Sequence, residues 1–272
     1  SLHTFGNNTN GQLGDGTTTT RNTPTQILAS GVSQIAAGGG HSLILKSDGS
    51  LHTFGMNTNG QLGDGTTTQR NIPTQILASG VSQIAAGTSH SLILKSDGSL
   101  HSFGLNDNGQ LGDGSTTQRN TPTQILASGV SQIAAGTSHS LILKSDGSLH
   151  SFGLNDNGQL GDGSTTQRNT PTQILASGVA QIAAGGGHSL ILKSDGSLHT
   201  FGKNNSGQLG DGTTTQRNTP TQILASGVAR LSEQPVPFAE TFTVSGGQST
   251  APYYDFNDSQ GCLLYTSPSP RD

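Results

Sequence analysis

Several residue types are scarce in this chain of 272 residues. It has one cysteine and no tryptophan, and Asp, Glu, Lys and Arg together make up only 10% of it. The cysteine, Cys262, lies in the final segment CLLYTSPSPRD. The rest of the chain therefore offers no disulfide, no thiolate nucleophile and no thiol ligand for a metal ion.

The few charges also limit the partners. The 12 Lys and Arg are spread almost evenly along the chain, and the formal net charge is -4. Nucleic acids and acidic membranes need clustered basic residues, so neither is expected as a partner. No apolar run is long enough to cross a bilayer, so membrane insertion is not expected.

Glycine and repetition are what the chain has in abundance. The 40 glycines are about twice the usual share. One pattern recurs every 49 residues, and its full copies start at Gly31, Gly80, Gly129 and Gly178. Such a period indicates a propeller, a solenoid or a stacked array.

The period also divides the chain. We assign residues 1–231 to the repeat array, with residues 1–30 as the second part of a repeat, and expect the register to fail after Gly227. Residues 232–237, with two prolines, are predicted to be a linker. Residues 238–261 are predicted to begin a second β domain. We interpret residues 262–272 as the translation of a sequencing adapter.

Each repeat carries signals for four short strands. In HSLILKSDGSLHTF, Asp48-Gly49 predicts a two-residue hairpin turn. That turn would pair Leu45 with His52 and Leu43 with Phe54. The small residues of VSQIAAG suit a strand at the centre of a ring, and the proline of TPTQIL suits an edge strand. Four such strands make a propeller blade.

The repeat also resembles a known family. The pattern G-x-x-H-S-L-x-L-x-x-D-G-x-L-x-x-F-G-x-N-x-x-G-Q-L-G-D-G, followed by a proline, is similar to the regulator of chromosome condensation repeat in its bacterial form, with Phe where that family usually has Trp. The resemblance implies an all-β fold, a β-propeller whose rings have about seven blades. This chain would be a truncated fragment, an incomplete ring of about five four-stranded blades of 49 residues. The signature residues are His41, His90, His139, His188, Asp48, Asp97, Asp146, Asp195, Gly60, Gln61, Leu62, Gly63, Gly109, Gln110, Leu111 and Gly112.

Catalytic and zinc sites were weighed against structural roles. His41, Ser42 and Asp48 are the residue types of a hydrolase triad, but the same set recurs in every full copy. Catalysis needs one constellation rather than equivalent ones. We therefore predict no enzymatic activity, and we expect His41 to be buried near the centre and bonded to backbone. A zinc ion shared by His41 and His52 would lack further ligands.

A calcium site was the third alternative. Residues 106–109, Asn-Asp-Asn-Gly, and Asp113 could supply oxygen ligands, but the repeats contain no Glu for a bidentate ligand. We expect the Asn and Gly residues to serve turns with positive φ, and the Gln and Leu of GQLG to pack under the loop. No cofactor and no metal site is predicted.

The copies differ at only a few positions, and those in the loop after the Phe-Gly pair are the candidates for binding. In a propeller such loops gather on the faces of the ring, and loops carry function more readily than the packed scaffold. Drift at solvated loop tips is the alternative explanation. The candidate binding positions are Asn7, Met56, Leu105, Leu154, Lys203, Thr58, Asp107, Asp156 and Asn205.

These observations predict a non-catalytic protein-interaction module. The resemblance points to a larger bacterial protein that is secreted or on the cell surface, because the bacterial members share the low charge and uniform repeats. One alternative is a guanine-nucleotide exchange factor for a small GTPase, which would need a distinctive loop in the missing blades. Another is a carbohydrate-binding propeller, which would need exposed aromatics. Because terminal blades lack neighbours, we also expect self-association through open blade edges.

Overall fold

The structure is a computed structural model, and it describes residues 1–228, 230 and 231. The segments predicted to be a linker (232–237), the start of a second β domain (238–261) and a translated adapter (262–272) lie outside the described residues. Within the described part every regular element is a β-strand. None of the described residues forms a helix long and apolar enough to cross a membrane.

The strands form one two-stranded and four four-stranded antiparallel sheets, which we call blades A to E in chain order. Blade A contains β1 (Leu2–Gly6) and β2 (Arg21–Leu28). Blade B contains β3 (Val32–Ala37), β4 (His41–Lys46), β5 (Leu51–Gly55) and β6 (Arg70–Leu77). Blade C contains β7 (Val81–Ala86), β8 (His90–Lys95), β9 (Leu100–Gly104) and β10 (Arg119–Leu126). Blade D contains β11 (Val130–Ala135), β12 (His139–Lys144), β13 (Leu149–Gly153) and β14 (Arg168–Leu175). Blade E contains β15 (Val179–Ala184), β16 (His188–Lys193), β17 (Leu198–Gly202) and β18 (Arg217–Leu224).

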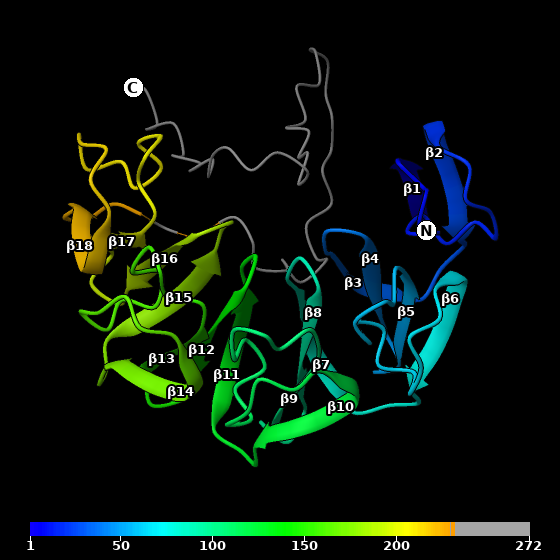
Figure 1. Ribbon diagram of the computed structural model, residues 1–272, viewed down its shortest axis with the longest axis horizontal. Helices are drawn as coiled ribbons and strands as arrows, with labels where there is room; N and C mark the ends of the chain where they lie inside the picture. The colour runs from blue at the N-terminus through cyan, green and yellow to red at the C-terminus, as the bar shows by residue number, and fades with distance from the viewer. Residues whose placement is uncertain (229, 232–272) are drawn as a thin grey trace, which may run out of the picture.

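The blades stand side by side along an open arc, with blade A and blade E on opposite sides of its opening (Figure 1). In each complete blade the strands pair in sequence order. The first strands β3, β7, β11 and β15 contact one another from blade to blade, so they lie innermost. The proline-containing strand is outermost. The predicted all-β incomplete propeller is confirmed, and so are the central VSQIAA strand and the edge position of the proline strand.

The predicted register of the β4–β5 hairpin was wrong by one residue. Leu45 pairs with Leu51 and Ile44 with His52. The turn is longer than two residues, because Gly49 N bonds to Lys46 O and Lys46 N bonds to Ser50 O. Gly49 has φ +78°, and no non-glycine residue in the described part has positive φ. Asp48 therefore sits in an ordinary turn conformation followed by a glycine bulge. A one-residue slip moves side chains to the other face of the sheet.

The core lies between blades rather than within one. Leu43, Leu45 and Leu51 of blade B pack against residues of blade C. Their partners are Val81, Ile84, Ile93 and Phe103. Complete burial of each such side chain contributes about 1.5–3 kcal/mol. Each blade is therefore stabilised mainly by its neighbours.

The repeat register continues four residues past the point where we expected it to fail. Leu231 is 3% exposed and packs with Val228 against blade E. Its backbone N–H donates to Gln181 Oε1 at 2.7 Å. Ile84 makes the same bond to Gln34 between blades B and C. Leu231 thus occupies the repeat position that Ile84 has in β7.

Candidate binding face

Each complete blade presents two different ends to solvent. The β3–β4 turn and the β5–β6 loop lie at one end, and the β4–β5 hairpin lies at the other, because neighbouring strands are antiparallel. We call these ends, taken together along the arc, the loop face and the hairpin face. Backbone bonds join the two connections of the loop face: Met56 N bonds to Gly40 O at 2.8 Å and Leu105 N to Ser89 O at 2.9 Å.

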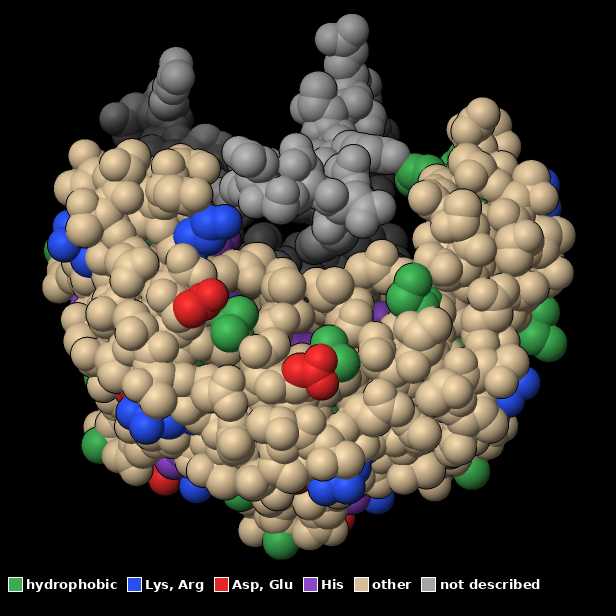
Figure 2. Space-filling model, viewed as in Figure 1, with side chains coloured by type: hydrophobic (Ala, Val, Ile, Leu, Met, Phe, Trp, Pro, Cys, Tyr) green, Lys and Arg blue, Asp and Glu red, His purple; other side chains and the backbone are tan. Residues whose placement is uncertain are grey.

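All nine candidate binding positions follow β1 or a β5-type strand, so they lie on the loop face. Asp107 and Asp156 are exposed, whereas Leu105 and Leu154 are half-buried. Asn7, Thr58, Lys203 and Asn205 are exposed, and Met56 is half-buried. One face of the arc shows isolated hydrophobic side chains with acidic side chains beside them, on a surface of mostly uncharged polar groups and backbone (Figure 2).

A second set of variable residues borders the first. Gly39-Gly40 in blade B corresponds to Thr88-Ser89, Thr137-Ser138 and Gly186-Gly187 in the later blades. A methyl group added at Gly40 would touch Met56, and one added at Gly187 would touch Lys203. The β3–β4 turn and the β5–β6 loop, which are far apart in the repeat sequence, therefore both differ between copies where they touch on the loop face.

The loop face is hollowed at blades D and E. A groove of about 640 Å³ is lined there by Leu154, Asn157 and Lys203 and continues along the strands of blade E, where Leu190, Leu198 and Ile223 line it together with His188. The Nε2 atom of His188 is buried and has no hydrogen-bond partner among the described residues. The groove combines apolar walls with one lysine at its rim.

Beneath this surface, the β5–β6 loop is held by a buried asparagine. Asn106 Nδ2 donates to Asp113 Oδ1, to Ser115 O and to Thr117 O at 3.1 Å each, and Asn106 Oδ1 accepts from Leu111 N. Asp113 Oδ2 also accepts from Arg119 Nε at 2.7 Å. Burial alone would raise the pKa of Asp113, but the hydrogen bonds from Ser115 and Arg119 hold it below its usual value.

These contacts bear on the calcium interpretation. The oxygens of Asn106 and Asp113 are bonded to the loop itself and to Arg119, so they are not directed at a shared empty position. In the GQLG segment Gln110 and Leu111 are buried, and Gln110 Oε1 accepts a hydrogen bond from Asn108 N. The positive-φ positions in the loop are glycines rather than asparagines.

The signature histidines join neighbouring blades. His41 is buried, as predicted, but its Nε2 lies 2.9 Å from the hydroxyl of Ser91 in the next blade rather than on backbone. Ser91 Oγ in turn donates to Gln61 O. Because the single hydroxyl proton goes to that carbonyl, the His41 Nε2 must donate, which leaves Nδ1 without a proton. The next two blade boundaries repeat this bond, as His90–Ser140 and His139–Ser189.

The structure does not bring the triad or zinc residues together. His41 begins β4, whereas Asp48 lies past the far end of that strand and caps Ser50 N. His41 is opposite Gly55 and His52 opposite Ile44. Positions 41 and 52 therefore point to opposite faces of the sheet. Burial lowers the pKa of His41 to about 4, which keeps it neutral.

The inter-blade bonds of serine and glutamine were not foreseen in the sequence. The signal was present, because a serine follows each signature histidine and the bonded pairs are 50 residues apart. Gln34 adds a second bridge by bonding to both the N–H and the C=O of Ile84. These contacts explain why His, Ser and Gln recur in each full copy.

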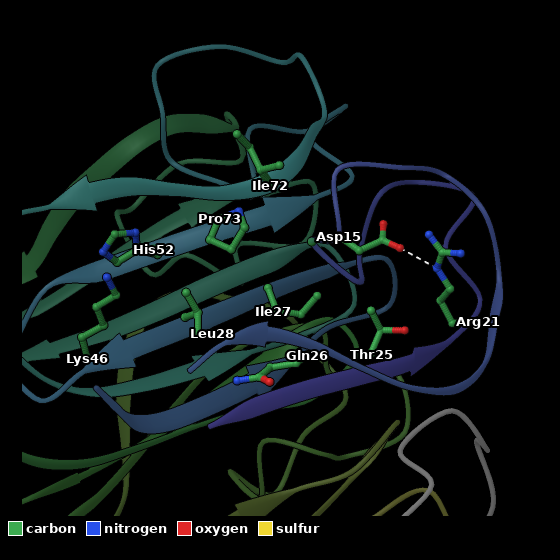
Figure 3. Close-up of a pocket in the computed structure, with 11 residues that line it drawn as sticks. Asp15, Arg21, Thr25, Gln26, Ile27, Leu28, Lys46, His52, Ile72 and Pro73 are labelled. Carbon is green, nitrogen blue, oxygen red and sulfur yellow. Dashed lines mark hydrogen bonds and ion pairs between the residues drawn. The ribbon is translucent and has the colours of Figure 1, made fainter. Parts of the chain in front are cut away.

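The phenylalanines of the β5-type strands and the groove between blades A and B bear on the carbohydrate alternative. Phe54, Phe103, Phe152 and Phe201 are at most 1% exposed, so they offer no stacking surface to a sugar. A second groove, of about 480 Å³, lies between blades A and B. Blade B contributes Lys46, His52, Ile72 and Pro73 to its lining, and blade A contributes the ion pair of Asp15 with Arg21 (Figure 3). It contains no aromatic ring apart from the imidazole.

Comparisons with known proteins agree with this architecture. The sequence model of the RCC1-like domain matches residues 1–251. Human WBSCR16 is similar in structure, with a TM-score of 0.73 and 28% identity over 83% of this chain and 63% of that one. Yeast RCC1 (Prp20) bound to Kap60 gives a TM-score of 0.68 and 26% identity over 75% of this chain and 52% of that one.

A second structure of Prp20 from Saccharomyces cerevisiae, studied with its binding to Gsp1p and histones, gives the same TM-score of 0.68 and 26% identity, over 75% of this chain and 53% of that one. No curated protein matches the sequence. The chain thus spans between half and two thirds of the length of these structures. The family model covers most of the chain, and the blades of the structure carry its repeat. This chain therefore belongs to the RCC1-like domain family.

Proposed function

We propose that this chain is a non-catalytic scaffold that binds a protein through its loop face. The observation that carries the proposal is the placement of sequence variation. Copies that are otherwise nearly identical differ at positions 56, 58, 105 and 107 and in the turns beside them, and these positions lie on the loop face. A few strand positions differ as well, such as Ile72 against Thr121 and Thr53 against Ser102. The hairpin face repeats the same Lys-Ser-Asp-Gly-Ser turn in each complete blade.

The chemistry of the loop face suits a peptide or protein surface. Half-buried Leu105 and Leu154 supply apolar contact area, and the neighbouring Asp107 and Asp156 supply charge. An interface with a small apolar centre and a polar rim is the usual arrangement for protein partners. Support from relatives is general: yeast RCC1 (Prp20) binds the protein Kap60.

We further propose that the chain is part of a bacterial protein that acts outside the cytoplasm. The low content of charged residues, 10%, and the uniformity of the repeats support this proposal. Antiserum against the chain, applied to intact source cells and to their culture fluid, tests it. Detection only after the cells are broken open would contradict it.

The experiment for the binding function starts from peptides selected on the immobilised chain from a random display library. Calorimetric titration then compares wild type with the double variant Leu105→Ser/Leu154→Ser. We expect the double variant to bind at least about tenfold more weakly, since each apolar contact contributes about 1 kcal/mol or more. The matched control, Ser96→Arg/Ser145→Arg on the hairpin face, should bind like wild type. Equal affinity of the Leu variant and wild type would contradict the proposal.

Nucleotide exchange on a small GTPase is the second candidate, favoured by the structural similarity to yeast RCC1 (Prp20). The nearly identical loops of blades C and D argue against it, because a single GTPase surface needs one distinctive contact site. Release of labelled GDP from a GTPase of the source organism tests this candidate. Accelerated release by the chain would favour exchange over a passive scaffold.

A further inference from the structure

The groove between blades A and B offers a second surface on which a protein could dock. Its volume is about 480 Å³, and ligand sites commonly enclose about 300–1,000 Å³. The outer strands β2 and β6 line it, together with both strands of the β4–β5 hairpin and the ion pair of Asp15 with Arg21 (Figure 3). None of the candidate binding positions of the loop face lines it. The groove is therefore a separate surface from the loop face.

Ile72 distinguishes this groove from the other joints between blades. The residue at its repeat position is threonine in every other blade, as Thr23, Thr121, Thr170 and Thr219. Ile72 is 59% exposed, although blade B packs against a blade on each side. A single exposed apolar side chain is common on a protein surface and is not by itself a binding site. Here, however, it forms part of the wall of a groove.

The Ile72 side chain fits the scaffold as the threonines do. A methyl group added at Gly16 would lie 3.7 Å from Cγ2 of Ile72, and one added at Gly65 would lie 3.8 Å from Cγ2 of Thr121. One branch of the two side chains therefore packs alike. The other branch is a hydroxyl in threonine and an ethyl group in isoleucine, so isoleucine adds apolar surface without a change in packing. The variant Ile72→Thr should thus fold as the other blades do.

The groove also carries a positive charge that its lining does not neutralise. Arg21 is paired with Asp15 at 2.6 Å. Lys46 forms no ion pair among the described residues, where each ion pair joins an Arg to an Asp. Asp48, on the same hairpin, bonds to Ser50 N and does not line the groove. An acidic group on a ligand would therefore be complementary to Lys46.

Extended main chain and apolar side chains follow this charge along the groove. Ile27 and Leu28 lie between Lys46 and the ion pair (Figure 3). Four consecutive residues of β2, 25–28, line the groove and span about 13 Å, at about 3.3 Å per residue. β2 is the outermost strand of blade A, and no strand of the described part pairs with its outer edge. Main-chain N–H and C=O groups on such an edge can pair with an extended peptide.

We infer that this groove binds an extended segment of a partner protein that carries one acidic side chain beside apolar ones. The acidic side chain meets Lys46, the apolar side chains pack against Leu28 and Ile72, and the main chain pairs with β2. A peptide segment suits the site because the open edge of a strand recognises a chain rather than an isolated anion. The other joints present threonine at the position of Ile72, so they bind the same segment more weakly.

Peptide selection on the 272-residue chain tests this inference. A random display library is panned on immobilised wild type in the presence of excess soluble Ile72→Thr, so that only peptides which require Ile72 are retained. The enriched peptides should carry Asp or Glu beside apolar residues. In calorimetric titration with one synthetic peptide of this set, Ile72→Thr should bind at least about tenfold more weakly, because the ethyl group no longer covers apolar surface. The matched control, Thr121→Ala at the next joint, should bind like wild type.

Two lysines at the same repeat position test the role of charge. Lys46→Gln should bind the peptide about threefold or more weakly at low salt, and its binding should depend less on salt than that of wild type. Lys46→Arg, which keeps the charge, and Lys95→Gln, at the next joint, should bind like wild type. Circular dichroism checks that each variant is folded.

The variant Leu105→Ser/Leu154→Ser distinguishes this groove from the proposed loop-face site, because it should bind the selected peptide like wild type. The inference would be overturned by a selection that enriches no peptide, or by enriched peptides that lack an acidic residue. Equal binding by Lys46→Gln and wild type, or loss of binding in the leucine variant, would overturn it as well.

Discussion

The imidazole Nε2 of His90 lies 3.0 Å from the hydroxyl of Ser140, which belongs to the next blade. Ser140 Oγ itself donates a hydrogen bond to Gln110 O, at 2.8 Å, in the loop that docks from blade C. One hydroxyl of blade D thus connects to both β8 and the docking loop of blade C. Removing it should affect the joint rather than a single blade.

Ser140→Ala should lower the free energy of unfolding by about 1–3 kcal/mol, because it leaves the buried His90 N–H and the Gln110 carbonyl without partners. The matched control is Ser42→Ala. Ser42 has the same repeat position and bonds to Gln12 O, but no histidine of a preceding blade faces it among the described residues. Urea denaturation should show a smaller loss for Ser42→Ala, and equal losses would contradict the role assigned to the histidine bond.

Acidification should destabilise the fold well above the pH at which carboxylates titrate. Burial lowers the pKa of His41 to about 4, and that of His90 and His139 to about 3, from the usual 6.5. Below pH 6.5 the unfolded chain binds protons that the folded chain does not, so stability falls as the pH drops. Each buried histidine can contribute as much as about 1.4 kcal/mol per pH unit over this window.

Urea midpoints measured between pH 7 and pH 5 test this sign. In His90→Gln the urea midpoint should change less with pH, because one buried histidine no longer contributes. In Lys95→Gln, at the half-buried end of the same strand, the midpoint should change with pH as in wild type. The carboxylates whose folded-state pKa is lowered, such as Asp113, lose their contribution as the pH falls from about 4, their pKa in the unfolded chain, toward the lower folded-state value. A midpoint that stays constant from pH 7 to pH 5 would contradict the account of the histidines.

Asn106→Ala should be among the most damaging substitutions in a loop. Its side chain takes part in five hydrogen bonds in a fully buried position, and the variant leaves Leu111 N and Asp113 with fewer partners. We expect the free energy of unfolding to fall by about 3 kcal/mol or more. The control is Asn108→Ala, because Asn108 is two residues away and only half-buried, and this variant should lower the free energy of unfolding by less than about 1 kcal/mol. Thermal denaturation of the two variants makes the comparison.

Two glycine substitutions should separate backbone strain from packing between blades. Gly112 has φ +77°, and a methyl group there would lie 2.8 Å from the ring of Phe152 in the next blade. Gly129 has φ +83°, with no atom within 4 Å. Gly129→Ala should lower the free energy of unfolding by about 1 kcal/mol, because alanine is strained at positive φ. Gly112→Ala should lower it by at least about 1 kcal/mol more, because its methyl group also overlaps the ring of Phe152. Equal unfolding free energies would show that the loop does not dock tightly.

Repetition made most of the fold predictable. Strand order, the central position of VSQIAA and the edge position of the proline strand follow from composition and period. The hairpin register did not, because Asp-Gly fits both a two-residue turn and a longer turn with a glycine bulge. The bond from Ser50 N to the Asp48 carboxylate at 2.9 Å favours the longer turn here. That choice depends on a local contact that a pattern of apolar residues does not encode.

The candidate site was predictable only in part. Differences between copies located the loop face, and the structure adds that the turn at Gly40 touches Met56. The partner of the signature histidine was missed because it lies in another repeat. The repeat period shows which residues occupy matching positions in different blades, but it does not show which of them contact each other across a blade boundary.

Hydrogen exchange of the chain with and without a selected peptide tests the central claim most directly. The account predicts that protection rises in the loop-face segments 56–59, 105–108, 154–157 and 203–206 and in the turns beside them. It predicts no change in the hairpin turns at 47–49, 96–98, 145–147 and 194–196. Protection confined to the hairpin turns, or spread evenly over both faces, would contradict the claim that the loop face is the binding surface.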